Sequence, residues 1–407
     1  MATLFLIIIY LAFISLGLPD SLLGSAWTVM RLDLHASLGS AGIISMTISA
    51  GTIISSLFSE KLIKRYGTGK ITFFSVLATA LALLGFSISP SFIWLIVFAV
   101  PLGLGAGSVD AGLNNYVALH YKPHHMSWLH CFWGVGATLG PMIMAQNIQK
   151  NSNWSNGYFI VSMIQFILVI LLFFTLPLWN KVSHKSELDL EIDNIKTKDI
   201  VTDDIATDDI AIKPNSNVSP FRIKGVKMAL IAFLFYCGLE STVGLWGSSF
   251  LVQMKDLSPA TAARWISLYY AGITVGRLIT GFITMKVSSK WLIRAGQIFI
   301  FIGTVLLLLP FSAGFSLAGL ILIGFGCAPI YPCMLHETPH RFGEAQSQKI
   351  MGVQMAVAYT GSTFLPPLLG FIASITSIII LPVFLIVYII AIFISSERIN
   401  VMMKDYI

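Results

Sequence analysis

The sequence predicts an all-helical membrane protein built from two related bundles of six transmembrane helices. Three observations support this prediction: the number of long apolar segments, the sorting of basic residues between loops, and the presence of similar motifs in both halves. The composition is 56% hydrophobic and only 11% charged. Soluble proteins contain about 25% charged residues, so the composition already indicates a chain embedded in lipid.

The apolar segments are long enough to cross a bilayer. A helix needs about 20 apolar residues to span a hydrocarbon core of about 30 Å. The twelve expected spans are 4–28, 38–60, 71–89, 92–119, 127–147, 157–179, 226–252, 262–285, 291–310, 315–335, 347–373 and 376–396. The first span lacks a basic leading region and a small-residue cleavage site, so we expect a retained helix and not a signal peptide.

Basic residues indicate the orientation of these spans. If the N-terminus is cytoplasmic, 20 of the 25 Lys and Arg residues fall on the cytoplasmic side, and one, Arg277, lies within a span. The other four fall on the opposite side. This asymmetry predicts cytoplasmic N- and C-termini in a multi-pass protein, which we expect in the cytoplasmic membrane of a bacterium. The basic charge is scattered over short loops, which argues against nucleic acid as a partner.

A polar stretch divides the spans into six plus six. Residues 181–221 hold nine of the 19 acidic residues and three near-copies of a pentapeptide, TKDIV, TDDIA and TDDIA, over 197–211. Such a segment has little apolar surface to bury, so we expect a disordered cytoplasmic linker. The predicted bundles are therefore 1–180 and 222–407.

The two bundles share motifs in corresponding helices. The first span has GLPDSLLG at 17–24, and the seventh has GLESTVG at 238–244. The fifth has GATLGP at 136–141 and the eleventh GSTFLP at 361–366, while GLG and GFG occur in the fourth and tenth. These matches predict a duplicated six-helix unit with a binding site between the halves, as in the major facilitator architecture.

Four ionisable residues lie inside the expected spans: Asp20, Asp110, Glu240 and Arg277. A charge at the bilayer centre costs at least about 2.5 kcal/mol, so such residues usually face a cavity or a partner. Asn114 follows Asp110 by four residues and shares its helical face. Burial disfavours the charged form of a carboxyl, so Asp20 and Asp110 are candidates to bind and release a proton. Glu240 and Arg277 have a structural alternative, a locking salt bridge.

Pro19 and several aromatic residues complete the candidate site. Pro19 removes the N–H that would bond the carbonyl of Ser15, which predicts a kink beside Asp20 and backbone groups facing the cavity. His130 is a candidate for binding, although a lone histidine there is often a packing residue. The aromatic candidates for stacking on a solute, each with packing as its alternative, are Trp133, Trp246, Tyr269, Tyr270, Tyr331 and Tyr359.

Other motifs favour a protein that is not an enzyme and has no cofactor. HETPH at 336–340 fits the zinc-protease pattern H-E-x-x-H, but Pro339 lies within it and no third ligand is evident, so we expect a helix-end loop. GLGAG at 103–107 follows no strand and indicates helix packing. The sequence has no ATP-binding P-loop motif and no CxxC pair.

These residues resemble the fucose–galactose–glucose:proton symporter family. DSLL at 20–23 resembles that family's first-helix motif, and GLG at 103–105 with Asp110 and Asn114 resembles its fourth-helix motif. GRLITG at 276–281 is similar to its eighth-helix segment. The resemblance implies that Asp20 and Asp110 take part in proton coupling and sugar binding.

The sequence departs from the family at four places. The family has Glu at the position of Asp110, Gln at that of Glu240, a sugar-contacting Gln at that of His130, and a polar residue at that of Trp133. Glu240 therefore adds a third possible proton site. These departures concern the identity of the substrate more than the mechanism.

Taken together, the sequence predicts a monomeric transporter that imports a small polar solute, with a monosaccharide as the first candidate, together with protons. Sodium is an alternative coupling ion. The predicted substrate-binding residues are Asp20, Asp110, Asn114, His130, Trp133, Glu240, Trp246, Arg277, Tyr331 and Tyr359. Three alternatives remain: a proton-coupled exporter of drugs or lipophilic metabolites, an intramembrane metalloprotease, and a receptor without transport activity.

Overall fold

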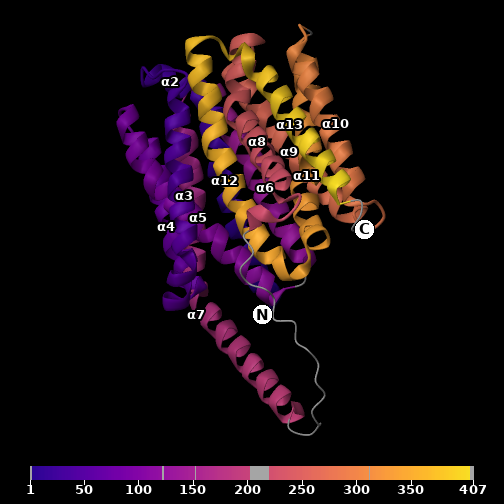
Figure 1. Ribbon diagram of the computed structural model, residues 1–407. Helices are drawn as coiled ribbons and strands as arrows, with labels where there is room; N and C mark the ends of the chain where they lie inside the picture. The colour runs from indigo at the N-terminus through magenta and orange to yellow at the C-terminus, as the bar shows by residue number, and fades with distance from the viewer. Residues whose placement is uncertain (1, 122, 152, 202–219, 311, 404–407) are drawn as a thin grey trace.

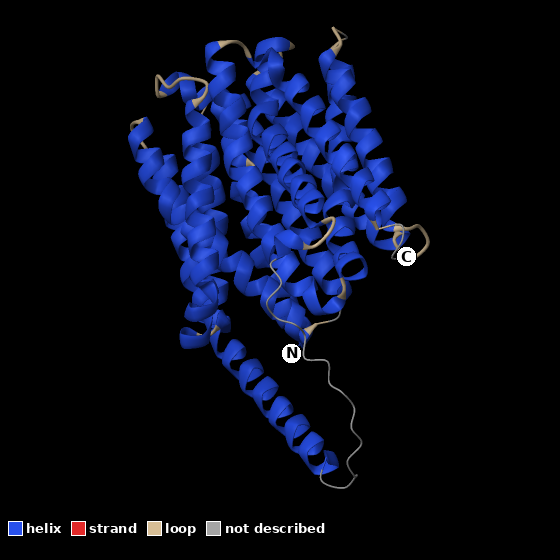
Figure 2. Cartoon of the chain, in the orientation of Figure 1, coloured by secondary structure: helices blue, strands red, loops and turns tan. Residues whose placement is uncertain are grey.

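The computed structural model describes residues 2–121, 123–151, 153–201, 220–310 and 312–403, and its regular structure within these ranges is helical (Figure 2). The helices run side by side, with α3, α4 and α5 at the left of Figure 1 and α10, α11 and α13 at the right. The all-helical membrane fold predicted from the sequence is confirmed.

The helices fall into two halves, α1–α7 and α8–α13. The first half comprises α1 (Ala2–Asp20), α2 (Leu22–Asp33), α3 (Ser40–Tyr66), α4 (Thr68–Ser87), α5 (Phe92–His120), α6 (Pro123–Asn151) and α7 (Trp154–Val201). The second comprises α8 (Val226–Met254), α9 (Pro259–Ile283), α10 (Ser289–Leu308), α11 (Ala313–Phe342), α12 (Glu344–Ile375) and α13 (Leu381–Met402). Short 3₁₀ turns, η1 (Pro220–Arg222) and η2 (Ile378–Ile380), precede α8 and α13.

The first membrane span consists of two helices, α1 and α2, which are interrupted at Ser21. Pro19 has no N–H, so the carbonyl of Ser15 loses its helical partner. The amide Nε2 of Gln165, on α7, donates to this carbonyl over 2.5 Å, and Gln165 is fully buried. The break beside Asp20 thus follows the prediction, but the freed carbonyl of Ser15 binds α7 and does not face a cavity.

Eleven helical segments within the described residues are long and apolar enough to span a membrane, with α1 and α2 counted as one. The expected span at 127–147 forms α6, which lies outside this set. The sequence of α6 contains histidines, tryptophans and glycines among its apolar residues. The helix α6 packs against α1 of its own half and α9 of the other half, so less of its surface faces lipid. Fewer of its side chains therefore have to be apolar.

The duplicated motifs make equivalent contacts in the two halves. A Cβ on Gly136 of α6 would lie 2.1 Å from the carbonyl oxygen of Ile14 on α1. A Cβ on Gly361 of α12 would lie 2.1 Å from the carbonyl oxygen of Leu234 on α8. In both halves, then, only glycine allows the two helices to approach this closely.

The halves contact each other through the helix pairs α2–α8, α3–α12 and α6–α9. A Cβ on Gly24 of α2 would lie 2.2 Å from the carbonyl oxygen of Gly244 on α8. A Cβ on Gly42 of α3 would lie 2.9 Å from the Cα of Pro367 on α12. The halves are therefore in backbone contact on the side of the bundle that carries the α2–α3 connection.

The helix α7 continues past its membrane span to Val201 and projects away from the bundle (Figure 1). The sequence predicts a disordered linker from residue 181, but residues 181–201 are helical. This stretch contains no glycine or proline and many Leu, Glu, Lys and Asp residues, so nothing in it stops the helix. Residues 202–219, with two of the three pentapeptide copies, lie outside the described residues.

The HETPH segment is helical, so the expected helix-end loop is wrong. The helix α11 runs to Phe342 and contains Pro339 in its interior. The rings of His336 and His340 lie one helical turn apart, with centroids separated by 5.4 Å. Among the described residues, no group of three or more His, Cys, Asp or Glu side chains is placed to hold a metal ion.

Candidate substrate and proton site

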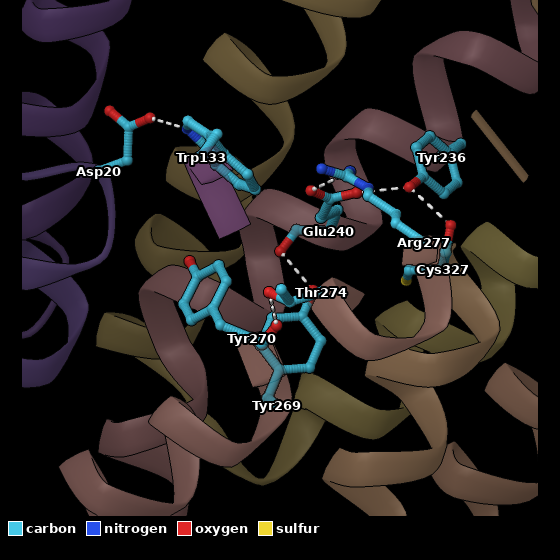
Figure 3. A network of polar contacts seen from close by, with 9 residues as sticks. All are labelled: Asp20, Trp133, Tyr236, Glu240, Tyr269, Tyr270, Thr274, Arg277 and Cys327. Carbon is cyan, nitrogen blue, oxygen red and sulfur yellow. Dashed lines mark hydrogen bonds and ion pairs between the residues drawn. The ribbon is translucent and has the colours of Figure 1, made fainter. Parts of the chain in front are cut away.

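Asp20 presents its carboxylate at the break between α1 and α2. Its side chain is exposed although the neighbouring Pro19 and Ser21 are buried. The indole Nε1 of Trp133, on α6, donates to Oδ2 of Asp20 over 2.8 Å (Figure 3). A neutral N–H donor holds the carboxylate in place without cancelling its charge, so Asp20 can still accept a proton or a ligand hydroxyl.

Asp110, on α5, accepts hydrogen bonds on both carboxylate oxygens. Asn114 donates from Nδ2 to Oδ1 over 2.8 Å, as their spacing on one helical face predicts. The hydroxyl of Tyr359, on α12, donates to Oδ2 over 2.9 Å. The contact with Tyr359 joins the two halves, and it depends on a carboxylate that can change its charge.

Glu240 and Arg277 form an ion pair within the second half. Nη2 of Arg277 on α9 lies 3.4 Å from Oε1 of Glu240 on α8, and their side chains are only 13% and 16% exposed. The hydroxyl of Tyr236 donates to Oε2 of Glu240 over 2.5 Å. Of the two interpretations of this pair from the sequence, the geometry favours the locking salt bridge over a third free proton site.

Arg277 also reaches the first half. Its guanidinium carbon lies 5.3 Å from the ring centroid of Trp133, the geometry of a cation–π contact. Asp20, Trp133, Arg277 and Glu240 thus form a continuous series of contacts, which we call the cross-half chain (Figure 3). It connects α1 and α6 with α9 and α8 and has a carboxylate at each end.

Two more aromatic candidates contribute to this region. The ring of Tyr270 packs edge-on to Trp133, with centroids 6.4 Å apart. The hydroxyl of Tyr269 donates to the backbone carbonyl of Glu240 over 3.1 Å, which fixes α9 against α8. Tyr270 is therefore adjacent to the cross-half chain, whereas Tyr269 supports the helix that carries Glu240.

Three further predicted binding residues contact other groups of the protein in this structure. Trp246 is fully buried and donates from Nε1 to the carbonyl of Pro366 over 2.7 Å. The hydroxyl of Tyr331 donates to Sδ of Met355 over 2.9 Å. The ring of His130 lies edge-on to that of Phe13 on α1, with centroids 6.0 Å apart. Trp246 thus sits in the packing between α8 and α12.

Tyr236 belongs to this site but is not among the residues predicted from the sequence. It is fully buried and its hydroxyl contacts both Glu240 and the carbonyl of Cys327. A signal is present in the sequence, because Tyr236 precedes Glu240 by four residues and must share its helical face. No such signal exists for the role of Tyr359 as a donor to Asp110, since it depends on how α5 and α12 meet.

The profile of the Major Facilitator Superfamily matches residues 9–258 and 228–399, which together cover most of the chain. The chain belongs to the major facilitator superfamily. It is therefore a multi-pass membrane transporter of this superfamily and not an enzyme.

Related sequences transport different solutes. The chain is 22% identical to the glucose/mannose transporter GlcP of Bacillus subtilis over 333 residues, 80% of this chain and 77% of that protein. It is 22% identical to the cis,cis-muconate transport protein of Acinetobacter baylyi over 372 residues, 90% of this chain and 86% of that protein. It is also 24% identical to bypass of stop codon protein 6 of Saccharomyces cerevisiae, over 91% of this chain and 77% of that protein.

Solved structures share the fold at low sequence identity. A bacterial homolog of the human lysosomal transporter Spinster superposes with a TM-score of 0.70 at 10% identity, covering 99% of this chain and 97% of that one. A peptide transporter in complex with sulfate superposes with a TM-score of 0.71 at 13% identity, covering 98% and 95%. At these identities the likeness concerns the fold alone.

Proposed function

We propose that this transporter imports a monosaccharide together with protons across the cytoplasmic membrane, by alternating access of its two halves. One observation carries the proposal: Asp20 and Asp110 lie where the halves meet, and the donors that hold them are neutral. Glu240, in contrast, is paired with a cation. Two carboxylates with uncancelled charge between the halves can couple proton binding to movement of the halves. This chemistry resembles that of the fucose–galactose–glucose:proton symporter family.

The groups around the two carboxylates suit a hydroxylated solute. They include the indole N–H of Trp133, the phenol of Tyr359 and the amide of Asn114. Oδ1 of Asn114 is buried and lacks a hydrogen-bond partner among the described atoms, so an unsatisfied acceptor lies beside Asp110. An exporter of hydrophobic cations would instead need a site formed mainly by Phe and Met. A relative that transports glucose and mannose supports the same choice.

In the proposed cycle, protonation changes the contacts of Asp110 with the other half. A charged Asp110 accepts a strong hydrogen bond from Tyr359, which holds α12 against α5. Protonation weakens this acceptor and lets Tyr359 turn to a sugar hydroxyl. The halves then rock, and the proton and sugar leave on the other side of the membrane.

Uptake by proteoliposomes tests the proposal. Vesicles with an alkaline lumen are offered a panel of monosaccharides and, as a carboxylate control, cis,cis-muconate, with a proton gradient or a sodium gradient. We expect concentrative uptake of a monosaccharide driven by the proton gradient. Asp110→Asn should abolish accumulation across pH 5–8 because an amide does not change its charge.

Asp256→Asn is the matched control, because Asp256 is exposed in the α8–α9 connection. Its φ of 52° is one that Asn tolerates. Wild-type accumulation by Asp110→Asn would contradict the coupling role of this carboxylate. Export of lipophilic cations without any sugar uptake would favour the exporter instead, and uptake that follows only the sodium gradient would overturn proton coupling.

A further inference from the structure

Trp133 is the one residue of the cross-half chain that contacts a charged group from each half. Its indole N–H donates to Asp20 on α1, and its ring face lies under the guanidinium of Arg277 on α9. The N–H lies in the plane of the ring, whereas the cation–π contact needs the ring face. A rotation of the side chain therefore changes both contacts together.

Arg277 is held firmly on the side of the second half. It pairs with Glu240, and the hydroxyl of Tyr236 holds the other oxygen of that carboxylate. The guanidinium consequently has little freedom to follow Trp133 if the ring turns. Loss of the contact between Trp133 and Arg277 is then the expected result of any movement of the indole.

The contact between Trp133 and Arg277 lies in line with a series of contacts between α6 and α9. Sγ of Cys131 lies 3.9 Å from the carbonyl oxygen of Thr274, and Ser267 donates to the carbonyl of Thr138 over 2.7 Å. Farther along, Nη2 of Arg264 donates to Oε1 of Gln149 over 2.6 Å. We call the α6–α9 contact between Cys131 and Gln149 the seam.

We propose that Trp133 is a positioning residue that couples the state of Asp20 to closure of the seam. While Asp20 is free to accept the indole N–H, the ring stays under Arg277 and the seam is held. A proton or a ligand hydroxyl that takes the place of the indole N–H at Asp20 releases the ring, and the seam opens. This inference rests on the proposed function for the identity of the ligand, but not for the mechanical link.

Other groups near the chain can modulate this link. Those that lie within electrostatic range of Asp20 or Arg277 are Asp110, His130, Cys131, Tyr236, Cys237, Tyr270, Cys327, Tyr331 and Tyr359. The test therefore compares variants at one fixed pH and in one background without the native cysteines, so that all groups other than the substituted residues are the same in every variant.

The test is a double-mutant cycle read by cross-linking at the far end of the seam. Gln149→Cys and Arg264→Cys replace two exposed side chains that contact each other across α6 and α9. The four native cysteines are replaced by serine or alanine. The yield of a short thiol cross-linker on purified, substrate-free protein then reports closure of the seam, without any use of transport activity.

Asp20→Ala should lower the cross-linking yield roughly two- to fivefold when Trp133 is present, the ratio expected for loss of one cation–π contact. In the Trp133→Phe background, which keeps a ring face but has no N–H, Asp20→Ala should have no further effect. Arg277→Lys should also remove the dependence on Asp20, because it keeps a charge for Glu240 but loses the planar stack.

An equal effect of Asp20→Ala in the Trp133 and Trp133→Phe backgrounds would overturn the proposal, because a merely structural tryptophan gives additive effects. Trp246→Phe is the matched control and should leave the effect of Asp20→Ala unchanged. Elution as one symmetric peak in gel filtration verifies that each variant folds. Since no substrate is used, the coupling through Trp133 can be observed even if no sugar uptake is found. Failure of this proposal and failure of the proposed function are therefore distinguishable.

Discussion

Asp20 and Glu240 occupy corresponding places in the duplicated motifs GLPDSLLG and GLESTVG, yet their surroundings differ. Asp20 is exposed and is held by the neutral N–H of Trp133. Glu240 is mostly buried and is paired with Arg277. One duplicated backbone position thus carries a carboxylate held by a neutral donor in one half, and a carboxylate paired with a cation in the other.

The comparison indicates that two copies of one motif can place their acids in different surroundings. In this structure the second half pairs its acid with a cation of the same half, and the first half holds its acid by a neutral N–H donor. The contact between Trp133 and Arg277 joins these two surroundings.

The largest expected effect comes from breaking the fixed pair. Arg277→Met leaves Glu240 as an unpaired charge in a mostly buried place, which should lower the free energy of unfolding by about 3–5 kcal/mol. Thermal unfolding in detergent measures this loss. Asp20→Asn should cost much less, because the amide oxygen still accepts the bond from Trp133.

The double variant Arg277→Met with Glu240→Gln is the control for the ion pair. Removing both charges should restore most of the lost stability, since the penalty lies in the unpaired carboxylate. If the double variant is as unstable as Arg277→Met alone, then the packing of the arginine side chain matters more than its charge. The contrast between the acid paired with a cation and the acid held by a neutral donor would then need another explanation.

A second prediction concerns the glycines that end the two motifs, Gly24 and Gly244. A Cβ on Gly24 would lie 2.2 Å from the backbone carbonyl of Gly244, so Gly24→Ala must push α2 and α8 apart. We expect a cost of about 3 kcal/mol in the state seen here, at the upper end for overpacking, because a backbone atom cannot turn aside. Transport should fall strongly, because this side of the bundle no longer closes.

Gly281→Ala is the matched control for that variant. Gly281 also lies in a membrane helix, and apart from its chain neighbours and the backbone of its own helical turns no atom lies within 4 Å of the place its Cβ would occupy. Thiol labelling of a cysteine that replaces the partly buried Ser40, at the start of α3, measures access to the closed side. Unchanged labelling in Gly24→Ala would show that the contact of Gly24 with Gly244 does not limit closure.

The fold can be predicted largely because hydropathy and charge sorting act along the chain. Each span except α6 is apolar over most of its length, and the packing of α6 between two helices explains its weaker signal. The linker is less predictable. Residues 181–201 are polar, which suggests disorder, but they contain no helix breaker and simply prolong α7.

The site can be predicted in its charges but not in its partners. A charge inside a span is visible in the sequence, so Asp20, Asp110, Glu240 and Arg277 can all be found there. The partners that decide their roles come from other helices, as Trp133 does for Asp20 and Tyr359 for Asp110. Such contacts depend on how helices distant in sequence cross, and no spacing rule within one helix reveals them.

The smallest expected effect separates the two tryptophans of the prediction, Trp133 and Trp246. Trp246→Phe removes one hydrogen bond to the carbonyl of Pro366 and keeps most of the buried ring, so stability should fall by about 1 kcal/mol. Sugar affinity and pH dependence should not change, because the indole N–H of Trp246 binds a backbone carbonyl and neither Asp20 nor Asp110. Trp133→Phe should show the opposite pattern, with little loss of stability and a clear change in affinity. Equilibrium binding of the sugar at fixed pH measures these affinities. An altered affinity in Trp246→Phe would place Trp246 in the substrate site. The distinction between Trp133, which contacts the exposed Asp20, and Trp246, which packs in the second half, would then be wrong.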